Sequence, residues 1–337
     1  MIKPKLLFVF VLSLLSFGLQ AQTMDNRYEL RVAQDGSGDY KTIQEAINQV
    51  RDHAEKRVVI HIKAGTYSEK VVIPAFKRNI TLQGEGVGKT IIQNGDYTGK
   101  AFRGIDVTGN PDYSTYTSYT LLVNANDCTL EGLTIENTAG RVGQAVALHT
   151  AGDRIVVRNC AILGNQDTLY LATAGTRNFF DNCTIAGTTD FIFGAATAYF
   201  LHCQIESLSN SYITAASTIK EEPYGFVFES CQLTAQEGAT KVFLGRPWRP
   251  YAKTVFLNTE MGTHIVPEGW HAWPGDKNFP NKEETAFYAE GGSTGPGAKD
   301  LSKRVSWAHQ LKKAELKKYG IAQVLRGWNP LNTADHE

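Results

Sequence analysis

The amino-acid sequence predicts an all-β protein folded as a parallel β-helix, which is a solenoid of short strands. Two observations favour this class. The composition suits a turn-rich β protein, with 31 Gly, only 3 Met and 10% aromatic residues in 337. In addition, a short motif recurs along the middle of the chain, in which a polar residue is followed by Cys, any residue, and Ile or Leu. Internal repetition of this kind is typical of solenoids.

The repeat is centred on the cysteines, which are separated by intervals of 32, 23, 20 and 28 residues. Residues two apart share one face of a strand, so Cys and the following Ile or Leu should point the same way. A coil of roughly 20–30 residues with several short strands is the unit of a β-helix. We expect the cysteines to stack as a buried column. They are Cys128, Cys160, Cys183, Cys203 and Cys231.

Helices are expected at both ends of the solenoid. Thr42 and Glu45 have the spacing of a capping box, and apolar residues from Ile43 to Val50 follow a helical period. This helix is predicted to cap the open end of the coil. A second helix is expected near 306–319, with a restart at Ile321. No linker divides the chain, so residues 23–337 are predicted to form a single domain.

Residues 1–22 are typical of a secretory signal peptide. Lys3 and Lys5 precede an apolar run from Leu6 to Leu19, and Ala21 is a small residue suited to the cleavage site. The run is shorter than the roughly 20 residues that span a bilayer. We therefore expect a secreted or periplasmic protein without a membrane span.

The balance of charge excludes one class of partner. Removing the two signal-peptide lysines from 34 basic and 34 acidic residues leaves a net charge of −2. Nucleic-acid binding usually requires a basic surface, so we expect no nucleic-acid partner. We also expect a monomer.

The cysteines could form one disulfide after export, because the compartment is oxidising. The interval of 20 residues between Cys183 and Cys203 is the shortest, so this is the pair expected to bond if any does. Five reduced cysteines remain the alternative. No CxxC or HExxH motif occurs, so the sequence predicts no metal site.

Two aspartates share a position relative to this repeat. Asp167 lies seven residues after Cys160, and Asp190 lies seven residues after Cys183. If the cysteines stack, these aspartates stack too, with Cα atoms roughly 5 Å apart. Close carboxylates resist double ionisation, so one pKa should rise while the other stays low. The pair then supplies an acid and a base or nucleophile. The alternative is two turn aspartates that bond their own backbone.

Other polar and aromatic residues are candidates to surround this pair. Gln144 and Gln166 offer amides, and Arg246 has a planar fork suited to a carboxylate. Trp248 and Trp270 offer flat surfaces for sugar rings. Each also has an ordinary structural interpretation as a sheet-face amide, a surface arginine or a packed tryptophan.

Four ordered segments resemble the signature segments of the pectin methylesterases (pectinesterases). Residues 35–43 and 287–298 are also similar, so the resemblance extends over about residues 30 to 330. It implies a right-handed parallel β-helix that needs no cofactor or metal. The four segments are GQAVAL at 143–148, GNQDTLY at 164–170, GTTDFIFG at 187–194 and LGRPW at 244–248.

The resemblance also implies a role for each candidate residue. Asp190 would be the nucleophile and Asp167 the general acid and later the base. Gln144 and Gln166 would donate to the oxyanion, and Arg246 would orient Asp190. The residues implied to line the substrate groove are Tyr170, Phe191, Trp248 and Trp270.

The implied substrate is methyl-esterified pectin, a polygalacturonan whose C6 esters would be cleaved to pectate and methanol. Residues 103–118 and 275–284 depart from the family pattern, which leaves the substrate pattern open. A glycoside hydrolase acting on polygalacturonate is the main alternative, because paired carboxylates near 5 Å also suit retaining glycosidases. A non-catalytic carbohydrate-binding solenoid and an esterase for another acyl group are weaker alternatives.

Overall fold

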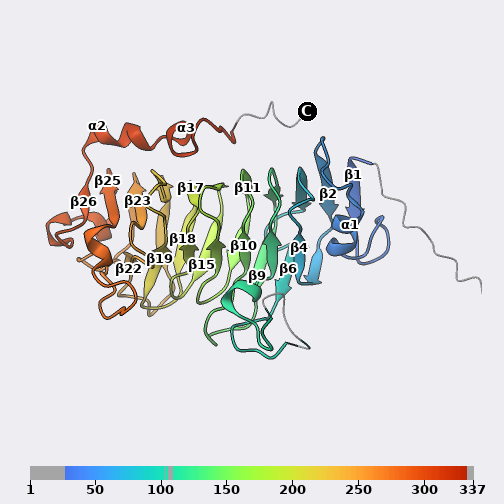
Figure 1. Ribbon diagram of the computed structural model, residues 1–337, viewed down its shortest axis with the longest axis horizontal. Helices are drawn as coiled ribbons and strands as arrows, with labels where there is room; N and C mark the ends of the chain where they lie inside the picture. The colour runs from blue at the N-terminus through green and yellow to red at the C-terminus, as the bar shows by residue number, and fades with distance from the viewer. Residues whose placement is uncertain (1–26, 103, 105–108, 332–337) are drawn as a thin grey trace, which may run out of the picture.

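The computed structural model describes residues 27–102, 104 and 109–331, and the expected signal peptide at 1–22 lies outside them. The described chain forms a right-handed parallel β-helix, which confirms the predicted fold (Figure 1). Successive coils add strands to three sheets, and every pairing between named strands of the described chain is parallel. The N-terminal and C-terminal coils therefore lie at opposite ends of an elongated molecule (Figure 1).

The three sheets form the walls of the solenoid. The first comprises β1 (Glu29–Val32), β2 (Val58–Ile62), β5 (Ile80–Gly84), β8 (Thr129–Glu131), β11 (Ile155–Arg158), β14 (Arg177–Asp181), β17 (Thr197–Leu201), β20 (Phe226–Glu229), β23 (Lys253–Leu257), β25 (Phe287–Gly291) and β26 (His309–Gln310). The second comprises β4 (Val71–Ile73), β7 (Leu121–Val123), β10 (Leu148–Thr150), β13 (Leu169–Leu171), β16 (Ile192–Gly194), β19 (Tyr212–Ala216) and β22 (Phe243–Gly245). The third comprises β3 (Gly65–Ser68), β6 (Thr90–Asn94), β9 (Thr134–Asn137), β12 (Ala161–Leu163), β15 (Thr184–Gly187), β18 (Gln204–Ser207), β21 (Gln232–Ala235) and β24 (Glu260–Met261).

The interior is filled by like residues stacked from coil to coil. Rings of Phe180, Phe200, Phe228 and Phe256 stack with centroids 4.7, 4.3 and 4.4 Å apart. All four rings are buried. Stacking at this spacing keeps the coils in register, because each ring contacts the same ring one coil away.

The cysteine column forms as predicted for four of the five positions. Cys160, Cys183, Cys203 and Cys231 precede successive strands of the third sheet, joined by bonds such as Thr184 N–H to Cys160 O at 2.9 Å. Burial raises the pKa of the Cys160, Cys183 and Cys203 thiols. Each of the five cysteines is a free thiol, which agrees with the alternative of five reduced cysteines rather than with a bond between Cys183 and Cys203.

Cys128 departs from the expected column. It precedes β8, a strand of the first sheet, and its carbonyl accepts from Val156 N at 2.9 Å. The position below Cys160 is occupied by Leu133, whose carbonyl accepts from Ala161 N. The motif at Cys128 therefore repeats the local pattern of a strand start without repeating its place in the coil.

The N-terminal end is capped by α1 (Ile43–Gln49), as predicted. The side chain of Thr42 accepts from Glu45 N, and the Glu45 carboxylate accepts from Thr42 N at 3.1 Å, which completes the capping box. Ile43, Ala46 and Ile47 are buried in the core of the solenoid. The helix thus closes the apolar interior at this end.

The C-terminal tail is less helical than expected. α2 (Lys313–Leu316) begins well after Ser306, because His309–Gln310 instead pairs with Ala289–Glu290 as β26. A 3₁₀ turn, η5 (Lys317–Tyr319), and α3 (Ile321–Val324) follow. The remaining 3₁₀ turns are η1 (Thr115–Thr117), η2 (Lys282–Glu284), η3 (Pro296–Ala298) and η4 (Leu301–Lys303).

This tail runs back along the outer face of the first sheet (Figure 1). Val324 and Leu325 belong to a buried apolar cluster with Val156, Phe179 and Tyr199. The tail therefore covers apolar side chains that the sheet would otherwise expose. Within the described chain, none of the helices has the length and apolar character needed to cross a membrane.

Candidate active site

The two aspartates occupy the same position on consecutive coils. Asp167 and Asp190 each lie two residues before a strand of the second sheet, and Leu169 of β13 pairs with Ile192 of β16. The spacing from the cysteines therefore predicted the register correctly. Both aspartates have left-handed backbone, with φ of 65° and 49°. Asp is one of the few non-glycine residues that adopt this conformation readily.

Burial and mutual repulsion separate the acidities of the pair. The side chains are largely enclosed, with residue exposures of 9% for Asp167 and 6% for Asp190. Burial raises the pKa of Asp167 well above its usual value, and the neighbouring Asp190 charge raises it further. Burial also raises the pKa of Asp190, but Arg246 opposes this effect. Asp167 therefore holds a proton more tightly than Asp190. The sequence predicted that one of the two carboxyl pKa values would stay low. That prediction is wrong, because burial raises the pKa of both aspartates.

Arg246 holds Asp190 through two parallel hydrogen bonds. Its Nε donates to Oδ1 at 2.9 Å and its Nη2 donates to Oδ2 at 2.6 Å. The guanidinium lies between two rings, 4.0 Å from the Tyr212 centroid and 3.5 Å from that of Trp273. Two bonds and two stacking contacts fix both the position and the charge of the carboxylate.

Two amides lie beside the carboxylates. Gln144 and Gln166 form a parallel bridge one coil apart, and Ala145 N donates to Gln166 O at 3.0 Å. Both line a cavity of about 390 Å³ together with Asp167 and Asp190. Neither side-chain amide bonds to another residue of the described chain. Their N–H groups are therefore available to a bound molecule.

Aromatic rings form the wall of the cavity. Phe193 lines it, stacks on Tyr170 at 4.5 Å and meets Trp248 edge-on at 5.8 Å. Trp248 lines the cavity, as expected. Tyr170 does not line it and contacts the cavity wall through the Phe193 ring. The full lining is Thr115, Tyr116, Gln144, Gln166, Asp167, Asp190, Phe193, Ala215, Arg246, Trp248, Arg249 and Trp273.

Two residues expected in the groove lie in the core instead. Phe191 is fully buried. Its side chain packs against the backbone of Gly187, because a Cβ built on that glycine would lie 2.2 Å from the Phe191 Cβ. Trp270 is 1% exposed and packs on Tyr288 at 4.6 Å. The left-handed residue at Asp190 breaks the strand alternation, which turns Phe191 inward.

Sequence reasoning missed several residues of the site. Phe193 lies three residues after Asp190, as Tyr170 lies three after Asp167, so the same register would have found it. Tyr212 and Trp273, which enclose Arg246, carry no comparable local signal. They reach the site because later coils and their loops return to it.

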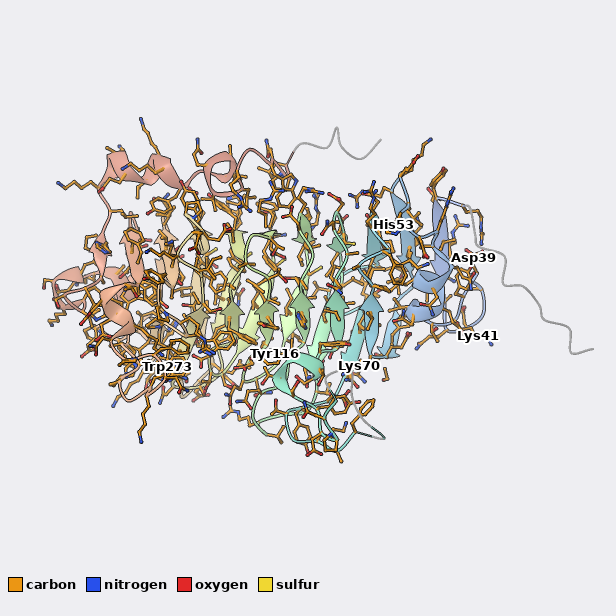
Figure 2. The ribbon with its side chains drawn as sticks, in the orientation of Figure 1. Asp39, Lys41, His53, Lys70, Tyr116 and Trp273 are labelled. Carbon is orange, nitrogen blue, oxygen red and sulfur yellow. The ribbon has the colours of Figure 1, made fainter. Side chains whose placement is uncertain are left out.

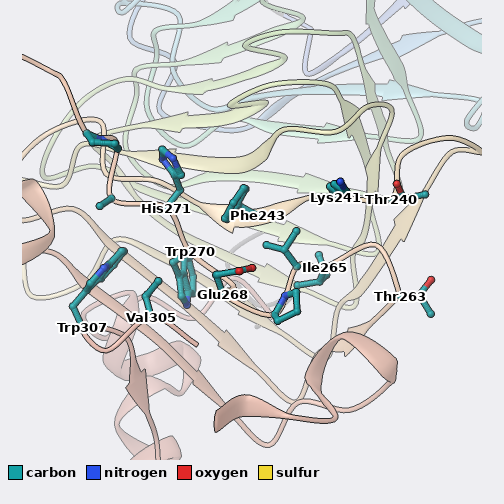
Figure 3. A pocket seen from close by; sticks show the side chains of 14 residues that line it. Thr240, Lys241, Phe243, Thr263, Ile265, Glu268, Trp270, His271, Val305 and Trp307 are labelled. Carbon is teal, nitrogen blue, oxygen red and sulfur yellow. The ribbon is translucent and has the colours of Figure 1, made fainter. Parts of the chain in front are cut away.

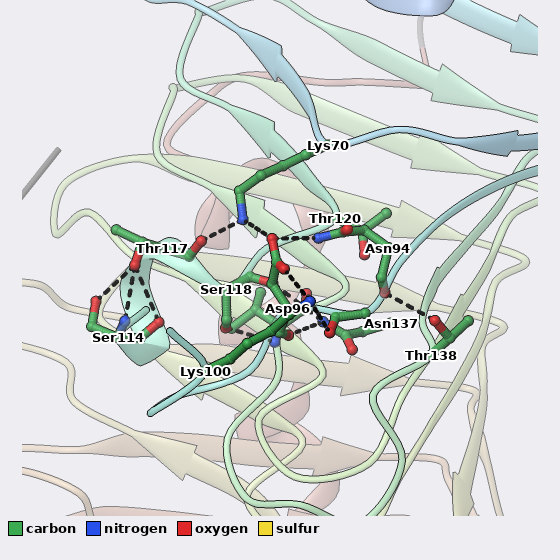
Figure 4. A network of polar contacts seen from close by, with 12 residues as sticks. Lys70, Asn94, Asp96, Lys100, Ser114, Thr117, Ser118, Thr120, Asn137 and Thr138 are labelled. Carbon is green, nitrogen blue, oxygen red and sulfur yellow. Dashed lines mark hydrogen bonds and ion pairs between the residues drawn. The ribbon is translucent and has the colours of Figure 1, made fainter. Parts of the chain in front are cut away.

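Residues 109–118, which belong to the segment 103–118 that the sequence singled out, form one edge of the cavity through Thr115 and Tyr116. It is held by Asp96, which accepts from Lys70 and from Lys100 at 2.8 Å each (Figure 4). Lys70 also donates to Thr117 O at 2.5 Å. The Asp96 network therefore ties this edge to the solenoid.

The opposite edge is formed by Trp273, beside the segment 275–284. Lys282 is 1% exposed, pairs with Asp276 at 2.7 Å and lies 4.4 Å from the Trp273 centroid. Figure 2 shows Tyr116 and Trp273 on the same long side of the solenoid. The described residues of both departures from the expected family pattern thus reach the neighbourhood of the cavity.

No group of three or more His, Cys, Asp or Glu side chains within the described residues could hold a metal ion. The chemistry available at the cavity is that of two carboxylates of unequal acidity, one arginine and two amides.

Comparison with known proteins shows which family has this sequence and architecture. The family model described as Pectinesterase matches residues 29–328. The chain belongs to the pectinesterase family. Pectinesterase 2 of Citrus sinensis is 38% identical over 293 residues, which cover 83% of this chain and 54% of that protein. The chain spans about half the length of the curated relatives it matches.

Solved structures of the same family share the fold. The pectin methylesterase from carrot superposes with a TM-score of 0.78 at 33% identity, covering 88% of this chain and 93% of that one. A pectin methylesterase in complex with hexasaccharide VII gives a TM-score of 0.76 at 29% identity, covering 91% and 99%. The resemblance inferred from four segments is thus confirmed at the level of the pectinesterase family.

Proposed function

We propose that this protein is a pectin methylesterase that hydrolyses C6 methyl esters of polygalacturonan through an aspartyl acyl-enzyme. The observation that carries the proposal is the buried pair of Asp167 and Asp190 with unequal acidities, beside two unengaged amides. Membership of the pectinesterase family supports the same reaction. The similarity to a pectin methylesterase solved in complex with a hexasaccharide also supports this reaction.

In the first half-reaction Asp190 attacks the C6 carbonyl of a methyl galacturonate. Arg246 occupies one lone pair on each oxygen of Asp190, so a second lone pair remains for attack. Gln144 and Gln166 donate to the oxyanion as it forms, and no reorganisation is needed because their amides already face the cavity. Asp167 gives its proton to the departing methanol.

In the second half-reaction Asp167, now ionised, removes a proton from water. The water attacks the acyl-enzyme, releases the galacturonate carboxylate and frees Asp190. The proton taken from the water leaves Asp167 protonated again, and its raised pKa favours this state at the start of each cycle. The cycle requires neither a metal nor an organic cofactor.

The pairing of carboxylates alone would also suit a retaining glycosidase. The two amides favour the ester, because an acyl oxyanion requires hydrogen-bond donors whereas an oxocarbenium ion does not. The decisive assay measures methanol and reducing ends in parallel on highly methylated pectin. We expect methanol release without shortening of the polymer. New reducing ends without methanol would overturn the esterase in favour of the glycosidase.

The matched variants are Asp190→Asn and Asp167→Asn, which keep the side-chain volume. Loss of an acid or base typically lowers turnover about 10²–10⁴-fold, and loss of the nucleophile should lower it at least as much. Circular dichroism should show that both variants fold. If Asp190→Asn kept more than about a tenth of the activity, equivalent to 1.4 kcal/mol, its role as nucleophile would be refuted.

We further propose that residues 1–22 are a signal peptide and that a single domain follows, exported as a monomer. The basic and apolar segments of the N-terminus support export. Sequencing the N-terminus of the protein recovered outside the cytoplasm tests it. A mature chain that still began at Met1 would contradict the proposal.

A further inference from the structure

A second and larger cavity lies on the C-terminal coils. Its volume is about 790 Å³, and aromatic side chains form much of its wall (Figure 3). Phe243 lies between His271 and Lys241 in this view, and Trp307 closes one side. The cavity holds neither catalytic carboxylate, so its role is distinct from that of the site described above.

This cavity continues the row of positions that carries the active site. Asp190 N donates to Tyr212 O at 2.8 Å, and Phe243 N donates to Ser211 O at 2.9 Å. Phe243 thus follows Asp190 by two coils, which at about 4.8 Å per coil is about 10 Å. Such a distance lies within the span of a short oligosaccharide.

Ring contacts bridge the two cavities. The Tyr212 ring lies 4.0 Å from the Arg246 guanidinium and stacks on Phe243 at 5.4 Å. His271 contacts both rings, at 5.1 and 5.3 Å, and lines the larger cavity. An unbroken aromatic surface therefore leads from the catalytic arginine into this cavity.

The polar groups of the larger cavity carry opposite charges. Lys241 and Glu268 are both exposed at its edge, and neither forms an ion pair with another described residue. Together they leave the cavity electrically balanced. Most of the remaining wall is apolar, with Ile265, Val305 and Trp307, and the uncharged polar residues Thr240, Thr263 and His271 complete it. A balanced, apolar and aromatic pocket suits a neutral sugar unit better than an anionic one.

We propose that this cavity is a distal subsite that binds a still-esterified galacturonate of the same pectin chain. The inference rests on the proposed function, because that function supplies the polymer. The methyl ester contacts the apolar wall, the sugar face stacks on Phe243, and Lys241 and Glu268 bond the hydroxyl groups. A free galacturonate would bring a carboxylate close to Glu268, and the repulsion disfavours it.

The test measures binding in the Asp167→Asn background, which prevents turnover. Calorimetry compares a methyl-esterified galacturonan octasaccharide with the trisaccharide. Phe243→Ala should weaken octasaccharide binding about tenfold relative to trisaccharide binding. Thr240→Trp, which narrows the mouth while keeping Phe243, should act in the same direction. The control Phe76→Ala removes a ring that is 43% exposed far from the cavity, and it should change neither affinity.

A charge variant tests the preference for the ester. Glu268→Gln leaves Lys241 unopposed, so it should strengthen binding of the unesterified octasaccharide several-fold relative to the esterified one. Unchanged octasaccharide binding in both Phe243→Ala and Thr240→Trp would overturn the subsite. If the Asp167→Asn protein without further changes already bound the unesterified octasaccharide more tightly, the proposal that this subsite recognises the methyl ester would be overturned.

Methanol release by the unmodified protein separates this inference from the proposed function. Without methanol release the esterase proposal fails, while pocket-dependent binding would still support the subsite. If methanol is released but neither pocket variant alters binding, only the subsite fails.

Discussion

Asp96 gives the sharpest stability prediction, because the structure places one buried carboxylate against two amines. Burial by itself raises its pKa, but hydrogen bonds from Lys100, Lys70 and Asn94 outweigh burial and lower the pKa to about 2 from 3.8. At 1.36 kcal/mol per pKa unit, this corresponds to about 2.5 kcal/mol of stability. The value is an upper bound, because Lys100 is 40% exposed and salt screens its share.

The sign follows from the lowered pKa. The carboxylate is more acidic in the folded protein than in the unfolded chain, so its contribution is complete above about pH 4. As the pH falls towards 2 the folded protein also begins to take up the proton, and most of the contribution is lost. Asp96→Asn removes the charge at every pH. We therefore expect the variant to be about 2 kcal/mol less stable at pH 7, with most of this difference lost by pH 2.

Urea unfolding followed by circular dichroism, repeated between pH 2 and pH 7, checks this expectation. The matched control is Asp112→Asn, an exposed carboxylate in the same loop that makes no ion pair with the described residues. The control should follow the parent throughout. A stability difference for Asp96→Asn that stays constant from pH 7 to pH 2 would refute the reasoning, since a packing defect does not titrate.

The remaining predictions concern the site and the core. Arg246→Lys should lower methanol release about 10²-fold, because an ammonium cannot replace two parallel bonds to Asp190; near-parental kcat would contradict the positioning role. Activity should fall on the acid side at a pH above the ordinary carboxyl pKa, because Asp190 must be ionised and burial raises its pKa; a pH–rate profile checks this, and an acid limb below pH 4 would disagree. Thiol titration of denatured, unreduced protein should find all five cysteines free, whereas three free thiols would reveal a disulfide.

The register of the two aspartates was predictable from the sequence, because a β-helix repeats at the length of its coil. Equal offsets from Cys160 and Cys183 are enough to place Asp167 and Asp190 side by side. The same argument fails at Cys128, where the local motif recurs at the start of a different sheet. A short motif identifies a strand start, but only the hydrogen-bond ladder identifies which sheet it begins.

The aromatic wall was only partly predictable. Proximity to Asp190 favoured Phe191, yet the structure places Phe193 at the cavity and Phe191 in the core. A left-handed residue changes which side chains point outward, and its presence is not visible in the sequence. The prediction that Trp270 lines the groove was wrong for a related reason. Its burial against Tyr288 depends on how the last coils and the C-terminal tail pack.

The sequence by itself determined the solenoid, the capping helix at Ile43–Gln49 and the pairing of the carboxylates, since all three follow from local patterns or from a repeat length. Only the tertiary structure decided that Tyr212 and Trp273 enclose Arg246 and that Lys70 and Lys100 converge on Asp96. These contacts join coils and loops of different lengths. Their geometry depends on where each loop returns to the solenoid, and packing of the assembled chain determines that return.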